Sequence, residues 1–118
     1  MFSIPAPINE QATASELKNR LDWGEPALSI IDIRSRAAFN ANRITGAVSI
    51  PAEELMERVS KTLEFERDIY IYGASDEQAA EATTQLRGAG YKSVAVLKGG
   101  FEAWKSARGA VEGAFVAA

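Results

Sequence analysis

The chain has 118 residues, of which 47% are apolar and 25% charged, and it carries a formal net charge of -3. This length fits one domain, and the composition is that of a soluble globular protein, not of a disordered or membrane protein. The sequence contains neither cysteine nor histidine, which excludes disulfides, thiolate nucleophiles, imidazole bases and metal sites built on these ligands.

Helices and strands alternate in the first half of the chain. Thr13 and Glu16 stand three positions apart and predict a capping box, which opens an amphipathic helix ending near Gly24. Residues 27–33 form a continuous apolar run typical of a strand buried on both faces. The other elements predicted here are an extended segment around Ile4, a helix over 35–41, a turn at Gly46, a strand over 47–50, and a helix over 53–63 with Leu55, Met56, Val59 and Leu63 facing inward.

The same alternation continues in the second half. We predict strands over 69–72 and 94–97, a helix over 76–89 ending at Gly90, and a final helix after residue 100. Strands and helices at these spacings predict an α/β fold, with a parallel sheet of about five strands and helices on both faces. We interpret residues 1–118 as one domain, with its core at about 4–108 and a C-terminal tail at 109–118 that we expect to fray.

The loop after Tyr72 is the first place to look for a site, because open α/β sheets bind ligands beyond the carboxyl ends of their strands. Its residues are Gly73, Ala74, Ser75, Asp76, Glu77 and Gln78. A short strand-to-helix loop points several backbone N–H groups at one place, which is the geometry of an anion site. Ser75 and Gln78 match a capping box, which puts Asp76 and Glu77 in the first helical turn. These two carboxylates favour the helix and would repel an anion.

Four motifs resemble, in order and spacing, the rhodanese homology family, and they cover nearly the whole chain. They are Ser29-Ile-Ile-Asp32-Ile-Arg34-Ser35, then Arg43-Ile-Thr-Gly46-Ala47-Val-Ser-Ile50-Pro51, then residues 69–72, then Leu97-Lys-Gly99-Gly100-Phe-Glu-Ala-Trp104. The resemblance implies a rhodanese-like three-layer fold. One scaffold position departs from the family, which typically has a histidine where this chain has Arg43.

The resemblance also implies where the chemistry of the family takes place. Active members begin the loop with a cysteine that accepts a sulfane sulfur as a persulfide, and many place an arginine five positions later. This chain has Gly73 and Gln78 at those positions. Glycine has no nucleophile and glutamine has no fixed charge. The resemblance therefore implies a family member that lacks the active-site cysteine and has no catalytic residue.

The remaining residues of the motifs are interpreted as structural. The resemblance implies that Asp32 and Arg34 form an ion pair that braces neighbouring loops.

Asp76 and Glu77 offer too few oxygen ligands for calcium or magnesium, so we expect neither a metal nor a cofactor. The other positions in this structural set are Arg43, Gly46, Gly99, Gly100 and Trp104, with the two adjacent glycines interpreted as a turn and Phe101 and Trp104 as core side chains.

Our leading hypothesis is a catalytically inactive rhodanese-like domain that acts as a binding or regulatory module with a protein partner. Scattered Lys and Arg residues predict no nucleic-acid partner. Strand-sized apolar stretches and a start without signal-peptide features predict no membrane association and a cytoplasmic location. We expect no tight small-anion ligand.

Three alternatives to this hypothesis stay open. One is a sulfurtransferase-family enzyme that uses a loop residue other than cysteine. Another is a hydrolase built on Ser75 or Asp76, which would need a base from another Asp, Glu or Lys because the chain has no histidine. The third is a partly degraded domain that is retained as a scaffold.

Overall fold

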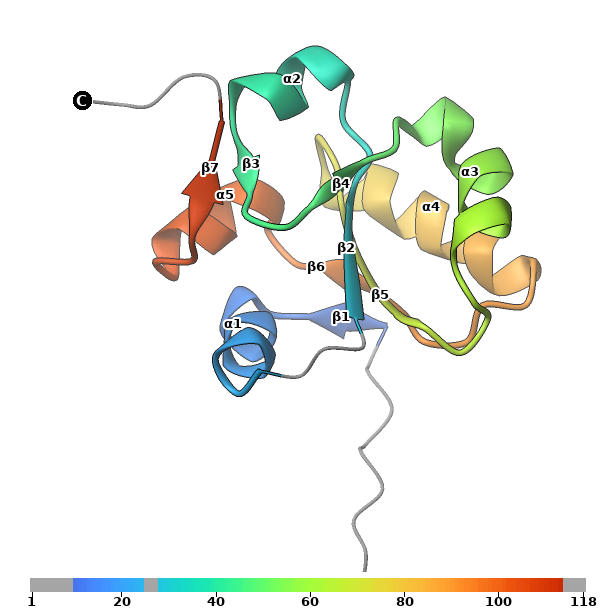
Figure 1. Ribbon diagram of the computed structural model, residues 1–118, viewed down its shortest axis with the longest axis horizontal. Helices are drawn as coiled ribbons and strands as arrows, with labels where there is room; N and C mark the ends of the chain where they lie inside the picture. Colours follow the sequence, from blue (N-terminus) through green and yellow to red (C-terminus); the bar gives the residue numbers. More distant parts are fainter. Residues whose placement is uncertain (1–9, 25–27, 114–118) are drawn as a thin grey trace, which may run out of the picture.

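The computed structural model describes residues 10–24 and 28–113, which fold around a single parallel sheet (Figure 1). The strand order is β1-β6-β5-β2-β4, and each neighbouring pair is parallel. The bounds of these strands are β1 Gln11–Ala12, β2 Leu28–Asp32, β4 Val48–Ser49, β5 Asp68–Tyr72 and β6 Val94–Leu97. This confirms the predicted α/β fold with a parallel sheet of about five strands.

Helices cover both faces of the sheet. Their bounds are α1 Ala14–Asp22, α2 Arg36–Ala41, the short 3-10 helix η1 Ala52–Glu54, α3 Leu55–Thr62, α4 Asp76–Gly88 and α5 Gly100–Ser106. Side chains of α3 and α4 pack on one face in one apolar cluster. Side chains of α1 and α5 pack on the other face in a second cluster. The predicted three-layer arrangement is therefore present.

Strand β5 shows why both faces need a helical layer. Ile69 and Ile71 belong to the cluster under α3 and α4, whereas Tyr70 and Tyr72 belong to the cluster under α1 and α5. Successive side chains of a strand point to opposite faces, and all four are at most 2% exposed. A strand buried on both faces is typical of parallel sheets.

Several predicted elements differ from the structure in detail. Met56 was predicted to face inward but is 36% exposed, because α3 buries Leu55 and Val59, four positions apart, and the adjacent position points to another side of the helix. The edge strand β1 was not predicted. The extended segment expected around Ile4 lies outside the described residues.

The expectation of a frayed C-terminal tail is wrong for residues 109–113. A second, two-stranded sheet joins β7, Val111–Glu112, to β3, Arg43–Ile44, in antiparallel register. The Trp104 indole N–H donates to the carbonyl of Ala110 at 2.9 Å, and the Thr45 N–H donates to the same carbonyl at 3.0 Å. A buried indole N–H needs an acceptor, and this segment supplies it. Residues 114–118 lie outside the described part of the chain.

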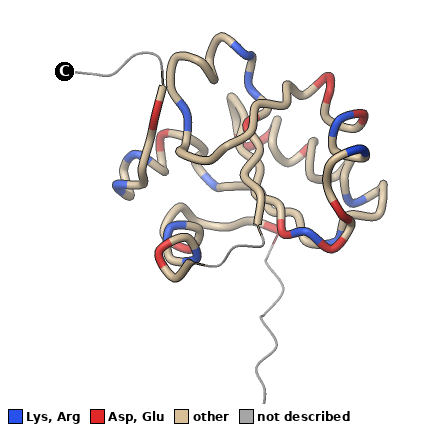
Figure 2. Tube along the Cα trace, in the orientation of Figure 1, with Lys and Arg blue, Asp and Glu red and all other residues tan. Residues whose placement is uncertain are grey.

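Within residues 10–24 and 28–113, no helix combines the length and hydropathy needed to cross a bilayer. In the view of Figure 2, Lys and Arg positions and Asp and Glu positions are interspersed along the tube.

Candidate functional site

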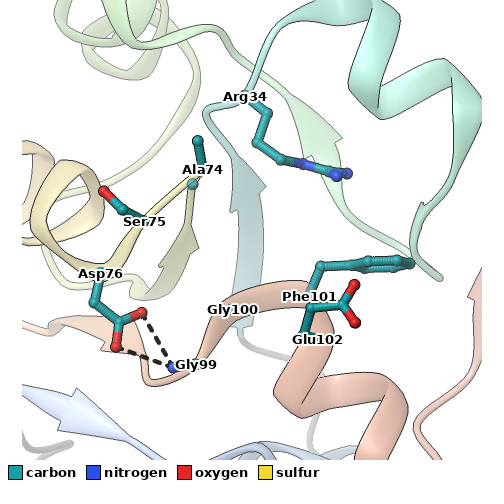
Figure 3. A pocket seen from close by; sticks show the side chains of 9 residues that line it. Arg34, Ala74, Ser75, Asp76, Gly99, Gly100, Phe101 and Glu102 are labelled. Carbon is teal, nitrogen blue, oxygen red and sulfur yellow. Dashed lines mark hydrogen bonds between the residues drawn. The ribbon is translucent and has the colours of Figure 1, made fainter.

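Residues that follow three strands of the parallel sheet line one cavity. It has a volume of about 490 Å³ and is lined by Arg34 after β2, by residues 73–76 after β5, and by residues 99–102 after β6 (Figure 3). Carboxyl ends of parallel strands meet at the same edge of a sheet, which is where such folds place their ligand sites. The first part of the loop after β5, which the sequence indicated as a site, therefore lines this cavity. Arg34 and the glycines Gly99 and Gly100 line it as well.

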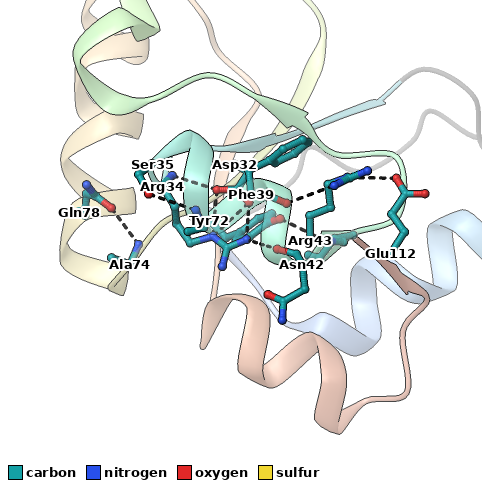
Figure 4. Close-up of polar contacts among 12 residues, drawn as sticks. Asp32, Arg34, Ser35, Phe39, Asn42, Arg43, Tyr72, Ala74, Gln78 and Glu112 are labelled. Carbon is teal, nitrogen blue, oxygen red and sulfur yellow. Dashed lines mark hydrogen bonds and ion pairs between the residues drawn. The ribbon is translucent and has the colours of Figure 1, made fainter. Parts of the chain in front are cut away.

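Arg34, which lines the cavity, forms an ion pair with the buried Asp32. Asp32 is 0% exposed. Its carboxylate accepts from Arg34 Nε at 3.1 Å and from Arg34 Nη2 at 2.7 Å, and also from the Arg34 backbone N–H at 2.9 Å. Arg34 Nη2 donates in addition to the carbonyl of Asn42 at 2.7 Å (Figure 4). The ion pair thus braces two loops, as the resemblance implied.

The charge of Arg34 is fixed by this environment. Burial lowers the pKa of the guanidinium, but the hydrogen bonds and the charge of Asp32 outweigh burial, so the pKa is raised above its usual value. The guanidinium carbon lies 5.4 Å from the centre of the Tyr72 ring and 5.2 Å from that of Phe101. Arg34 is therefore a permanent cation between two rings, with its charge balanced by Asp32.

The Tyr72 hydroxyl makes a hydrogen bond within the cluster under α1 and α5, to which both Tyr72 and Ile44 belong. Its Oη accepts from the backbone N–H of Ile44 at 3.2 Å. Burial raises the pKa of the Tyr72 phenol well above its usual value, and the neighbouring Asp32 carboxylate adds to the increase. The phenol stays neutral at physiological pH, so it acts as a structural hydroxyl.

The loop after β5 begins with Gly73 and leads into α4. Ser75 is the N-cap of α4, and its Oγ accepts from the Gln78 N–H at 3.1 Å. The second half of the predicted capping box is wrong, because Gln78 Oε1 accepts from the Ala74 N–H at 2.8 Å and not from the N–H of Ser75 (Figure 4). The Gln78 oxygen lies close to Gly73, 2.4 Å from where a Cβ at that position would be.

Asp76 joins the loops that follow β5 and β6. Both of its carboxylate oxygens lie 3.1 Å from the Gly99 nitrogen, whose N–H they accept (Figure 3). Gly99 has a φ of 78°, and a Cβ there would lie 2.5 Å from the Cβ of Ala103. The turn predicted at Gly99 is therefore present and requires glycine. No sequence spacing signals its bond to Asp76, because the two residues lie 23 positions apart.

These contacts limit what the loop residues can do chemically. Ser75 Oγ serves as a helix cap, Asp76 is held by a backbone N–H, and Glu77 is exposed at the start of α4. Among the residues that the structure describes, no group of three or more acidic side chains is placed to hold a metal ion. Ser75 Oγ and the Asp76 carboxylate are thus both engaged in hydrogen bonds to backbone N–H groups.

The other structural positions lie beside the site. Arg43 Nη1 donates to the carbonyl of Phe39 at 3.2 Å, and Arg43 Nε donates to Glu112 Oε1 at 3.3 Å (Figure 4). Gly46 has a φ of 88°, and Trp104 is 2% exposed.

Comparisons with known proteins agree with this architecture. The rhodanese-like domain family matches residues 13–107. The chain is 33% identical over 97 residues to a sulfurtransferase from Allochromatium vinosum, covering 82% of this chain and 88% of that protein. It is 35% identical over 97 residues to the HTH-type transcriptional regulator Rv0324 of Mycobacterium tuberculosis, covering 80% of this chain and 41% of that protein. The chain thus spans less than half the length of this regulator.

A solved structure shows the same fold. The crystal structure of the Alr3790 protein from Anabaena sp. matches with a TM-score of 0.85 and 50% identity, covering 89% of this chain and 94% of that one. The family match over residues 13–107 includes every residue that lines the cavity. This chain therefore belongs to the rhodanese-like domain family and is homologous to sulfurtransferases.

Proposed function

We propose that this chain is a catalytically inactive rhodanese-like domain that acts by binding a protein partner. One observation carries the proposal: the loop that lines the cavity begins with Gly73, in a chain without a single cysteine. A persulfide forms on a thiolate, and neither glycine nor any other side chain of the loop can replace it.

The cavity supplies a binding surface that does not depend on sulfur. It combines the guanidinium of Arg34 and the ring of Phe101 with the exposed carboxylates of Asp76 and Glu102. A volume of about 490 Å³ lies within the range of sites that bind small molecules or inserted side chains. Mixed charges beside an aromatic ring suit a protein surface better than a simple anion, which the two carboxylates repel. The relative named as a transcriptional regulator supports a regulatory role.

An activity assay tests the loss of catalysis. We expect the purified protein to show no thiosulfate-to-cyanide sulfur transfer above a protein-free control. We also expect millimolar phosphate, sulfate or thiosulfate to leave the thermal midpoint unchanged, because a ligand far below its dissociation constant adds almost no stability. Turnover that survives rigorous purification, or a saturable rise of the midpoint with one of these anions, contradicts the proposal.

Affinity capture from the native cell tests the binding role. The bait is the full chain, compared with Ala74→Arg, which places a bulky cation at the mouth of the cavity, and with Glu57→Arg, an exposed position on α3. We expect a partner that binds the wild-type chain and Glu57→Arg and is lost from Ala74→Arg. Equal recovery from all three baits, or no specific partner at all, favours a domain retained as a scaffold and overturns the proposal.

A further inference from the structure

The side chain of Gln78 lies where a side chain at position 73 would begin. A Cβ built on Gly73 would lie 2.4 Å from Gln78 Oε1, far inside contact distance. The same Cβ would lie 3.0 Å from Ile33 Cγ1 and 3.2 Å from Ile33 Cδ1. Ile33 is 1% exposed, so this side of the space is closed by the core. The carboxamide closes the other side.

The atom that fills this space also makes a hydrogen bond to the loop. Gln78 Oε1 accepts from the Ala74 N–H at 2.8 Å (Figure 4). Backbone N–H groups just before a helix have no partner within the helix, and other groups must satisfy them. A carboxamide oxygen is a neutral acceptor that can do so. Gln78 therefore combines two roles, as filler beside Gly73 and as acceptor for the next residue.

We infer that Gly73 and Gln78 are one coupled pair, in which Gln78 is a positioning residue that holds the loop closed on itself. Position 73 carries a side chain only when the carboxamide withdraws, and withdrawal leaves the Ala74 N–H without its acceptor. The inactive loop is thus a self-bonded conformation and not an active loop that lacks one sulfur atom. This inference concerns the local geometry, so it stands or falls independently of the proposed partner.

Hydrogen exchange tests the acceptor role. In Gln78→Ala, we expect the Ala74 amide to exchange about tenfold faster than in the wild type, as measured by NMR on isotope-labelled full-length chain. Gln85→Ala is the matched control, because Gln85 is an exposed residue of the same type on the same helix. An unchanged Ala74 rate in Gln78→Ala, or an equal increase in Gln85→Ala, overturns the inference.

A double-mutant cycle tests the coupling. Gly73→Ala is compared with the wild type, and Gly73→Ala with Gln78→Ala is compared with Gln78→Ala alone, each by its urea midpoint. The contact with Ile33 is common to both backgrounds and cancels. We expect a larger drop of the midpoint when Gln78 is present, together with faster exchange of Ala74 in Gly73→Ala. Equal drops in the two backgrounds show that the positions are independent and contradict the inference.

Discussion

The ends of strands β2 and β5 lie side by side, but the polar groups at the end of β2 are buried, whereas those that follow β5 are exposed. The two strands pair directly, with Asp32 opposite Tyr72. At the end of β2, the Asp32 carboxylate is fully buried and bound by Arg34. Beyond β5, the loop from Ala74 to Glu77 is exposed, and it forms hydrogen bonds with Gln78 and with Gly99.

This difference separates two kinds of polar residue in one cavity. Removing one partner of a buried ion pair leaves an uncompensated charge in the core, which costs several kcal/mol. Replacing a residue of an exposed loop costs far less, provided that the backbone groups keep their partners. We therefore expect the fold to depend more strongly on the Asp32–Arg34 pair at the end of β2 than on any single side chain of the exposed loop after β5.

The largest effect is expected from breaking the buried pair. Arg34→Met leaves the Asp32 carboxylate buried without its cation, and we expect a loss of about 3–5 kcal/mol in the free energy of unfolding. Arg36→Met is the control, because Arg36 also binds a carboxylate through two nitrogens, but at an exposed position. The control should lose less than about 1 kcal/mol. Urea unfolding of both variants measures the difference, and similar losses would remove the contrast between buried and exposed pairs.

A smaller effect is expected from Tyr72→Phe. The change leaves the Ile44 N–H without its acceptor, and we expect a loss of about 1–3 kcal/mol. Burial, assisted by Asp32, raises the pKa of the Tyr72 phenol above its usual value, so the folded protein keeps this proton longer than the unfolded chain. The stability linked to that proton is present below about pH 10 and is lost as the pH rises above it.

Urea unfolding at about pH 8 and about pH 11 checks both parts of the Tyr72 prediction. The difference in the free energy of unfolding between the wild type and Tyr72→Phe should shrink by up to about 1.4 kcal/mol for each pH unit above the usual phenol pKa. A gap that stays constant or widens at alkaline pH would show that the phenol titrates alike in the folded and unfolded states.

Within the exposed loop, Ser75→Ala is expected to cost about 1 kcal/mol. The serine hydroxyl is the N-cap of α4 and accepts the Gln78 N–H, and caps of this kind contribute about that much. Ser75→Asn, which keeps a capping oxygen, should recover most of the loss. Thermal and urea unfolding measure both variants. A loss from Ser75→Asn as large as that from Ser75→Ala would point to a role beyond capping.

The smallest effect is expected in the Gly73→Cys variant, where the loop should leave the pKa of the new thiol near its usual value. Asp76 and Glu77 lie at the same helix end and disfavour a thiolate, so they offset the usual acidifying influence of a helix N-terminus. We expect a thiol pKa no lower than the usual value of about 8.5 and little sulfur transfer. The chain has no other cysteine, so the pH dependence of the alkylation rate reports on this thiol alone.

A companion variant sharpens the prediction for Gly73→Cys. Combining it with Asp76→Gly and Gln78→Arg removes a negative charge and adds a positive one, which should lower the thiol pKa. The loss of Asp76 also removes the acceptor of the Gly99 N–H, so this variant should be less stable. If the thiol of Gly73→Cys alone titrates well below about pH 7 and the variant transfers sulfur, then the loop supports the chemistry once a cysteine is present. That outcome contradicts the expectation that Asp76 and Glu77 disfavour the thiolate.

Much of the fold could be predicted from the sequence because its signals are local. The alternation of Ile and Tyr along β5 follows from the two-residue period of a strand, and the Thr13–Glu16 capping box follows from its spacing. Both features are present. The Asp32–Arg34 pair came from a family motif of the same short range, and two residues at a buried strand end can meet without help from distant parts of the chain.

Other features were decided only by the tertiary structure, because they connect segments that are far apart in the sequence. Strand β1 is defined by its pairing with β6, and β7 by its pairing with β3, because two-residue strands carry no period of their own. The bond from Gly99 to Asp76 depends on two loops meeting at one sheet edge. The space beside Gly73 is bounded by Gln78 Oε1 from α4 and by the Ile33 side chain, which follows β2. Sequence spacing determines which groups are near along the chain, but three-dimensional packing decides which acceptor each donor reaches.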